Sequence, residues 1–184
     1  MTRRELAWAI GLANWLRAAP PQPHGSHTHA PPEPDRWAAY QPKFFSADEF
    51  RALETFTAIL IPTDDTPGAR EAHVAHFIDF VIDAAAEHAP EMQTEWRSAM
   101  EWLRSHDFAS LDARRQLDLV TRMSEPEIDR SKKHDGFPVY RLIKDMTVRA
   151  YYTSRAGLVD ALEYKGNAYL TEFPACTHPE HRKV

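Results

Sequence analysis

The stretch "ILIPTDDTPGA", residues 59–69, separates two apolar segments with two prolines, an acidic pair and a glycine. Proline fixes φ and lacks an amide hydrogen, so Pro62 is expected to end the helix that precedes it. Thr66 is a favourable N-cap, and Pro67 suits the first position of a following helix, where a missing amide costs nothing. The stretch therefore predicts a sharp turn between two antiparallel helices.

Apolar residues recur at helical spacing on both sides of this turn. Ser46 followed by Glu49 has the capping-box pattern, in which each side chain satisfies a free amide at a helix start. The first helix then buries a stripe made of Phe50, Leu53, Phe56 or Thr57, and Leu60. The second helix buries Val74, Phe77, Ile78, Val81, Ile82 and Ala85.

Three further helices are predicted downstream. One follows Pro90, and another follows Ser110, with a second capping-box pattern at Ser124 and Glu127 around Pro126. The last spans residues 137–154. Their expected apolar positions are Met92, Trp96, Ala99 and Leu103 in the first, Leu117 and Val120 in the second, and Val139, Leu142, Ile143, Met146 and Ala150 in the third.

The fold class that follows is all-α, because no long alternating run predicts a strand. We expect one helical domain over residues 44–184, ending in an irregular tail after Gly157. Residues 20–43 form a linker rich in proline, with His24, His27 and His29 best explained as solvated polar groups. Residues 1–19 form a separate N-terminal segment.

The N-terminal segment fits two interpretations. Arg3 and Arg4 precede an apolar stretch, which is the layout of a twin-arginine export signal and predicts a periplasmic protein. The alternative is an amphipathic helix that docks through Trp8, Leu12, Trp15 and Leu16, in which case the chain stays in the cytoplasm. The stretch is too short to span a bilayer, so no transmembrane span is expected.

Composition excludes several classes of function. The formal net charge of -5 and the pI near 6.0 argue against nucleic acid as a partner, because such binding needs a clustered positive field. The single cysteine, Cys176, rules out an internal disulfide framework. No phosphate-binding loop, dinucleotide fingerprint or nucleophile elbow is present, so no cofactor is expected in this chain.

Three groups of residues are candidates for metal binding or acid–base catalysis. The tail places Cys176, His178 and His181 within six residues, and these are possible zinc or iron ligands. A helical His73, His76 and Asp79 would share one face, although a core histidine or a partly exposed one is the simpler explanation for His76. Asp64 and Asp65 precede an expected helix start, where the helix dipole explains their charge without catalysis.

The order of these features resembles a known family. The helix that ends in "LIPTDDTPGA", the "FID" that follows it, the later T-x-x-x-YYTS segment and the "YKGNAYLTEFPACTHPEH" tail are similar to the gluconate 2-dehydrogenase subunit 3 family. The resemblance covers roughly residues 44–181.

The resemblance implies a non-catalytic small (gamma) subunit, with no catalytic residues of its own. The expected partner is a large FAD-containing dehydrogenase of the glucose-methanol-choline (GMC) type, which oxidises a sugar, gluconate or glycoside. A cytochrome c subunit is a possible further partner. The family also implies a role in folding, flavin loading and export of the large subunit, although the N-terminus here departs from a regular twin-arginine signal.

A rigid turn loses little conformational entropy on binding, and aromatic residues are enriched at interface centres. The candidate partner-binding residues are therefore Pro62, Asp64, Pro67, Tyr151, Tyr152, Tyr164, Tyr169 and Phe173. The alternative function is a small metal-binding protein or metalloenzyme that uses Cys176, His178 and His181. A helical adaptor for some other partner is a third possibility.

Overall fold

The computed structural model describes Trp37 and residues 39–167, and within these ranges the chain is helical and contains no strand. The all-α fold class is therefore confirmed. None of the described helices is long and apolar enough to cross a membrane. The elements are α2 (Ala47–Leu60), α3 (Val74–Ala84), α4 (Pro90–Ser105), η1 (Phe108–Ser110), α5 (Ala113–Ile128), α6 (Phe137–Thr153) and η2 (Ala156–Ala161).

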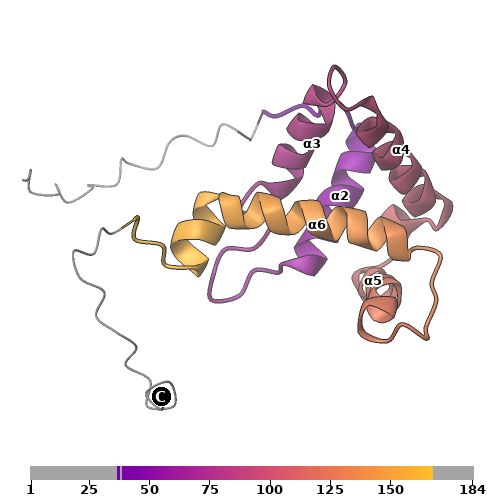
Figure 1. Cartoon of the computed structure of the whole chain (residues 1–184). Coiled ribbons are helices and arrows are strands. Elements are labelled where there is room, and N and C mark those ends of the chain that lie inside the picture. The colour runs from indigo at the N-terminus through magenta and orange to yellow at the C-terminus, as the bar shows by residue number, and fades with distance from the viewer. Residues whose placement is uncertain (1–36, 38, 168–184) are drawn as a thin grey trace, which may run out of the picture. The chain divides into compact units, whose positions relative to one another are not determined.

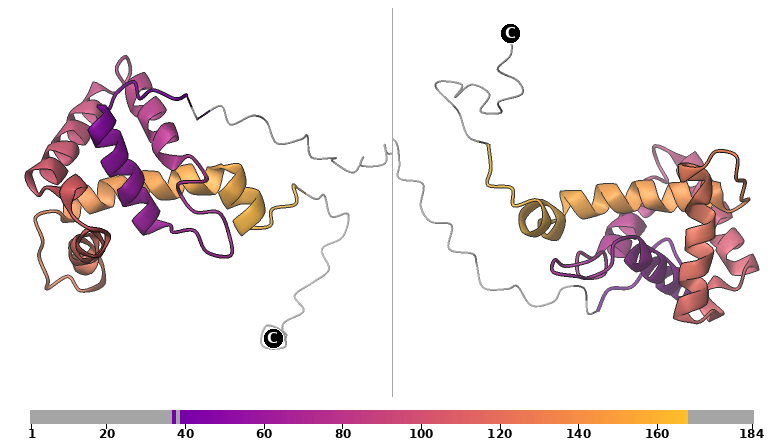
Figure 2. Two further views of the ribbon diagram at one scale, coloured as in Figure 1. Left: turned by 180° about the vertical axis from the view of Figure 1, so that it is seen from behind. Right: turned by 90° about the horizontal axis from the view of Figure 1, so that it is seen from below.

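Helix α6 is the element on which the others assemble. It contacts α2, α3, α4 and α5, and it passes directly into the π-helical turn η2. Figure 1 shows α6 crossing α2, with α3 and α4 beside it. Figure 2 shows the same crossing from behind and shows α5 lying across the N-terminal end of α6.

The apolar stripes predicted from the sequence form most of the core. The largest completely or almost completely buried side chains are Leu53, Phe56, Val74, Ile78, Ile82, Trp96, Leu103, Phe108, Met123 and Ile143. Two predicted core residues point to solvent instead, since Phe77 is 42% exposed and Leu117 is 52% exposed. On α5 the buried apolar residues are Leu119, Val120 and Met123, so its inner face is turned away from Leu117.

The capping box at the start of α2 is confirmed. The Ser46 hydroxyl accepts a hydrogen bond from the Glu49 amide at 3.3 Å, and the Glu49 carboxylate accepts one from the Ser46 amide at 2.8 Å. The N-cap of α5 is Asp112, whose carboxylate accepts from the Arg115 amide at 2.9 Å. This helix therefore starts just after the residue Ser110 that we expected to precede it.

The prediction of a second capping box at Ser124 and Glu127 is wrong. Ser124, Pro126 and Glu127 all lie inside the last turns of α5. The Ser124 hydroxyl donates a hydrogen bond to the Thr121 carbonyl at 2.7 Å, so its partner lies inside the helix and it does not cap a helix start. The carboxylate of Glu127 accepts hydrogen bonds from Tyr140 and Lys144 on α6, so contacts between helices replace the local pairing that the pattern predicted.

Candidate functional site

The turn between α2 and α3 is a tightly closed loop. The Ala69 amide donates to the Ile61 carbonyl at 2.9 Å and brings the two ends of the loop together. Gly68 packs so closely against residues 61–63 that an added Cβ would lie 2.6 Å from the Thr63 nitrogen and 2.8 Å from the Ile61 oxygen. Only glycine fits this position without moving the backbone.

Two carboxylates of the loop, those of Glu71 and Asp64, accept hydrogen bonds from other residues of the same loop. Glu71 accepts hydrogen bonds from the Thr63 hydroxyl at 2.7 Å and from the Gly68 amide at 3.1 Å. These contacts lower the pKa of Glu71, chiefly through the Thr63 hydroxyl. Asp64 accepts from the amide and the hydroxyl of Thr66, and the amide contributes most to lowering the pKa of Asp64. The loop is therefore ordered by its own side chains.

The prediction that Thr66 and Pro67 begin the next helix is wrong. Helix α3 begins at Val74, and its N-cap His73 has a left-handed φ of 52° with no side-chain capping bond. The amide and the hydroxyl of Thr66 both donate hydrogen bonds to the Asp64 carboxylate. These bonds stabilise the loop and do not cap a helix. Asp64 likewise stabilises a turn and does not interact with a helix end.

Tyr151 of α6 supports this loop from the interior. Its hydroxyl donates a 2.6 Å hydrogen bond to the Pro67 carbonyl, and its side chain is only 2% exposed. Pro62 and Asp64 are exposed, and Pro67 is half-buried. The loop thus presents Pro62 and Asp64 on the surface while Tyr151 holds its inner side.

A second ordered feature lies where residues 40–45 pack on α3. The carboxylate of Asp79 accepts four hydrogen bonds from this segment, from the Tyr40 hydroxyl at 2.6 Å and from the amides of Lys43, Phe44 and Phe45 at 2.7, 3.0 and 3.0 Å. Asp79 is completely buried. Its role is to fix the approach of the chain to α2.

The electrostatics of this anchor follow from its contacts. Burial alone would raise the pKa of Asp79, but the hydrogen bonds from Lys43, Tyr40, Phe45 and Phe44 outweigh it, and the pKa is lowered. Burial and the bond to Asp79 raise the pKa of Tyr40. Asp79 is therefore held ionised and Tyr40 neutral.

His76 is buried in the core, which is one of the two simpler explanations that the sequence left open. Its ring centroid lies 4.7 Å from that of Tyr40, 5.0 Å from that of Trp37 and 5.0 Å from that of Phe50. His73 also contacts it, at 5.1 Å between centroids. Among the described residues, no group of three or more His, Cys, Asp or Glu side chains is placed to hold a metal ion.

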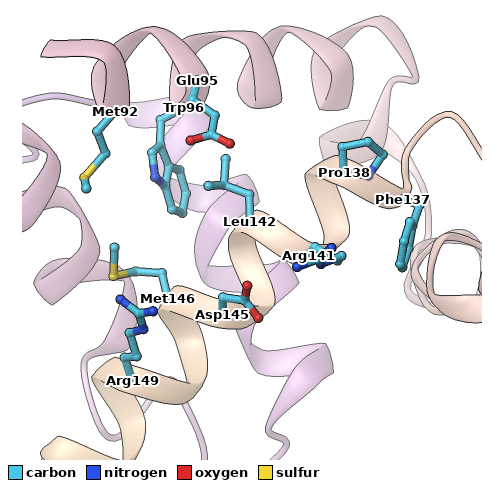
Figure 3. Close-up of a pocket in the computed structure, with 10 residues that line it drawn as sticks. All are labelled: Met92, Glu95, Trp96, Phe137, Pro138, Arg141, Leu142, Asp145, Met146 and Arg149. Carbon is cyan, nitrogen blue, oxygen red and sulfur yellow. The ribbon is translucent and has the colours of Figure 1, made fainter. Parts of the chain in front are cut away.

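A surface groove of about 460 Å³ runs between α4 and α6. Figure 3 shows its lining, with Met92, Glu95 and Trp96 from α4 facing Leu142, Asp145, Met146 and Arg149 from α6. Phe137, Pro138 and Arg141 extend the lining toward the start of α6. The groove combines an apolar floor with charged rims.

Several apolar side chains remain on the surface near the end of α6. Val148 is 40% exposed, Tyr152 is 42% exposed and Tyr164 is 45% exposed. Tyr152 and Tyr164 are therefore placed where a partner can reach them. The remaining predicted residues, Tyr169, Phe173, Cys176, His178 and His181, lie outside the described residues.

The sequence did not indicate the roles of four residues that organise these surfaces. Gly68 and Glu71 close the loop, Asp79 anchors residues 40–45, and Trp96 lies under the groove. Only Gly68 had a local indication, since it follows proline in a turn. Glu71 acts through hydrogen bonds within the loop, whereas Asp79 and Trp96 act through contacts between distant segments.

Comparison with known proteins gives one family. The family model described as gluconate 2-dehydrogenase subunit 3 matches residues 47–169, which is well over half of the 184-residue chain. The matched range begins at the first residue of α2 and includes the loop, the groove and the end of α6. No curated protein and no solved structure matches the chain significantly.

Proposed function

The chain belongs to the gluconate 2-dehydrogenase subunit 3 family, and from this premise we propose that it is the non-catalytic small subunit of a flavin-dependent dehydrogenase. The family is that of a subunit of a gluconate dehydrogenase complex, so a catalytic partner is implied. In our proposal this partner is a large GMC-type flavoprotein that carries FAD. The small subunit binds it and supports its folding and flavin loading.

The family match over residues 47–169 is the observation that carries this proposal. The loop that follows α2 supports it, because Glu71, Asp64 and Tyr151 order the loop before any partner is present. A preorganised surface loses less conformational entropy on association. The exposed Tyr152 adds an aromatic side chain of the kind enriched at interface centres.

The proposal assigns the chemistry to the partner. The large subunit oxidises a sugar, gluconate or glycoside at its flavin, and a cytochrome c subunit accepts the electrons. We further propose that the assembled pair reaches the periplasm by the twin-arginine route through the N-terminal segment, and that a chain whose signal does not work keeps the complex in the cytoplasm.

Copurification tests the proposed association. The tagged chain is coexpressed with the large subunit, and the purified material is analysed for stoichiometry and for flavin absorbance. We expect a complex of the two chains in which the flavin is bound to the large subunit. A chain that purifies alone, or that retains flavin after the large subunit is removed, would contradict the proposal.

A further inference from the structure

The groove between α4 and α6 contains a buried hydrogen-bond donor with no acceptor. Trp96 is completely buried, and its ring contacts Phe45 edge to face at 5.8 Å between centroids. Its indole N–H makes no hydrogen bond with any described residue. Buried donors are rarely left unpaired in folded proteins, so this N–H calls for an acceptor.

Two methionines lie on the side of the groove that this donor faces. In Figure 3 the indole nitrogen of Trp96 is turned toward Met92 of α4 and Met146 of α6. Both methionines are partly buried against the core. Unbranched thioether side chains change conformation easily and are common at adaptable binding surfaces. They are therefore suited to move apart and admit another side chain.

A positive charge lies at the same end of the groove. Figure 3 draws the guanidinium of Arg149 beside Met146, while the charged ends of Glu95, Asp145 and Arg141 lie toward the other side. The ion pairs among the described residues all involve other side chains, so Arg149 forms none with a described residue. A fixed donor and an unpaired cation together favour an anionic acceptor.

We propose that this end of the groove receives an acidic side chain of the large subunit. The incoming carboxylate accepts a hydrogen bond from the Trp96 N–H and pairs with the Arg149 guanidinium, and a neighbouring apolar side chain packs between Met92 and Met146. This inference rests on the proposed function, which supplies the large subunit as the occupant. It adds the surface that is bound and the chemistry of the segment that binds it.

Charge reversal at the rim tests the pairing. The dissociation constant of the complex is measured for the wild-type chain, for Arg149→Glu and for the control Arg114→Glu, which reverses an exposed charge on α5 outside the groove. We expect Arg149→Glu to weaken binding at least about tenfold, or about 1.4 kcal/mol. Arg114→Glu is expected to change it less than about twofold, within the usual range for exposed charges away from an interface.

Removal of the donor tests the second contact. Trp96 is replaced by 3-benzothienylalanine, which keeps the size of the ring and has sulfur in place of the N–H. We expect binding to weaken at least about tenfold, as for the loss of one hydrogen bond to a charged group, while the thermal midpoint of the isolated chain does not fall. This combination separates a contact with a partner from a contribution to folding.

The outcomes distinguish the two proposals. Failure of the wild-type chain to bind the large subunit would overturn the proposed function and this inference together. If the wild-type chain binds normally, and if Arg149→Glu and the Trp96 replacement leave the dissociation constant unchanged, this inference alone would be overturned. A change in the oligomeric state of the isolated chain on Arg149→Glu, measured by light scattering, would assign the groove to a second copy of the chain and also overturn it.

Discussion

The hydroxyl of Tyr151 donates a 2.6 Å hydrogen bond to the carbonyl of Pro67, and this bond joins the C-terminal part of α6 to the loop between α2 and α3. The two residues are separated by 84 positions in the sequence. Because Tyr151 is buried and residues 62–65 of the loop are exposed, the bond connects the core to a loop that reaches the surface.

Tyr151→Phe removes this bond and leaves the Pro67 carbonyl without its partner. We expect the free energy of unfolding to fall by about 1 kcal/mol. The amides of Ala69 and Val74, which donate to carbonyls within the loop region, should exchange faster with solvent. Chemical denaturation and hydrogen exchange measure the two effects.

Tyr152→Phe is the matched control. Tyr152 is adjacent, is 42% exposed and forms no hydrogen bond through its hydroxyl among the described residues. Its loss of one oxygen should change stability by less than about 0.5 kcal/mol. Equal effects of the two substitutions would show that the bond to Pro67 does not order the loop.

Gly68→Ala tests the close packing of the loop. The added Cβ would meet the backbone of residues 61–63 at 2.6 to 2.8 Å, and backbone atoms cannot rotate away. We expect a loss of about 3 kcal/mol in the free energy of unfolding. Gly166→Ala provides the comparison, since its Cβ would meet nothing within 4 Å and only its φ of +90° is strained. Its cost should be about 1 to 2 kcal/mol, as for an L-residue in the left-handed region.

Asp79→Asn tests the anchor of residues 40–45. The two carboxylate oxygens accept from four donors, so an Asn amide group would place its own N–H against one of them. We expect a loss of about 2 to 3 kcal/mol in the free energy of unfolding. Asp118→Asn, on the exposed face of α5, should cost less than about 0.5 kcal/mol.

The same anchor predicts a pH dependence. The pKa of Asp79 is lower in the folded chain than its unfolded value of about 4. Its stabilising contribution is thus complete above the unfolded pKa and is lost as the pH falls through the folded pKa. The stability difference between wild type and Asp79→Asn should shrink as the pH falls below about 4, and denaturation curves with a constant difference down to the acid limit would refute the assignment.

Thr147→Val tests a buried hydroxyl. Thr147 is completely buried on α6, and its hydroxyl makes no hydrogen bond with any described residue. Replacing it with a methyl group of similar shape removes an unpaired polar atom and keeps the branched side chain. We expect stability to rise by about 1 kcal/mol, measured by thermal denaturation. A marked fall would show that the hydroxyl has an acceptor.

The parts of the fold that follow from local patterns were predictable from the sequence. The Ser46 capping box, Pro90 at the start of α4 and the stripe of α6 depend on neighbours within one or two turns. The start of α3 was not predictable in this way. Thr66 and Pro67 match a local helix-start pattern, but the bond from the distant Tyr151 and the packing of Gly68 stabilise a loop there.

The candidate surfaces show the same limit. Pro62 and Asp64 were expected on the surface because proline and aspartate mark turns, and they are exposed. Asp79 was placed in a possible cluster with His73 and His76, yet its partners lie 34 to 39 positions earlier in the chain. Three of those partners are backbone amides, which no side-chain pattern can indicate.

We propose that this chain enables a separate flavoprotein to become active. The most direct measurement is dehydrogenase activity and bound flavin in the soluble fraction when the large subunit is expressed with and without this chain. We expect soluble, flavin-loaded activity only when both chains are present. Equal activity and flavin content in the absence of this chain would contradict it.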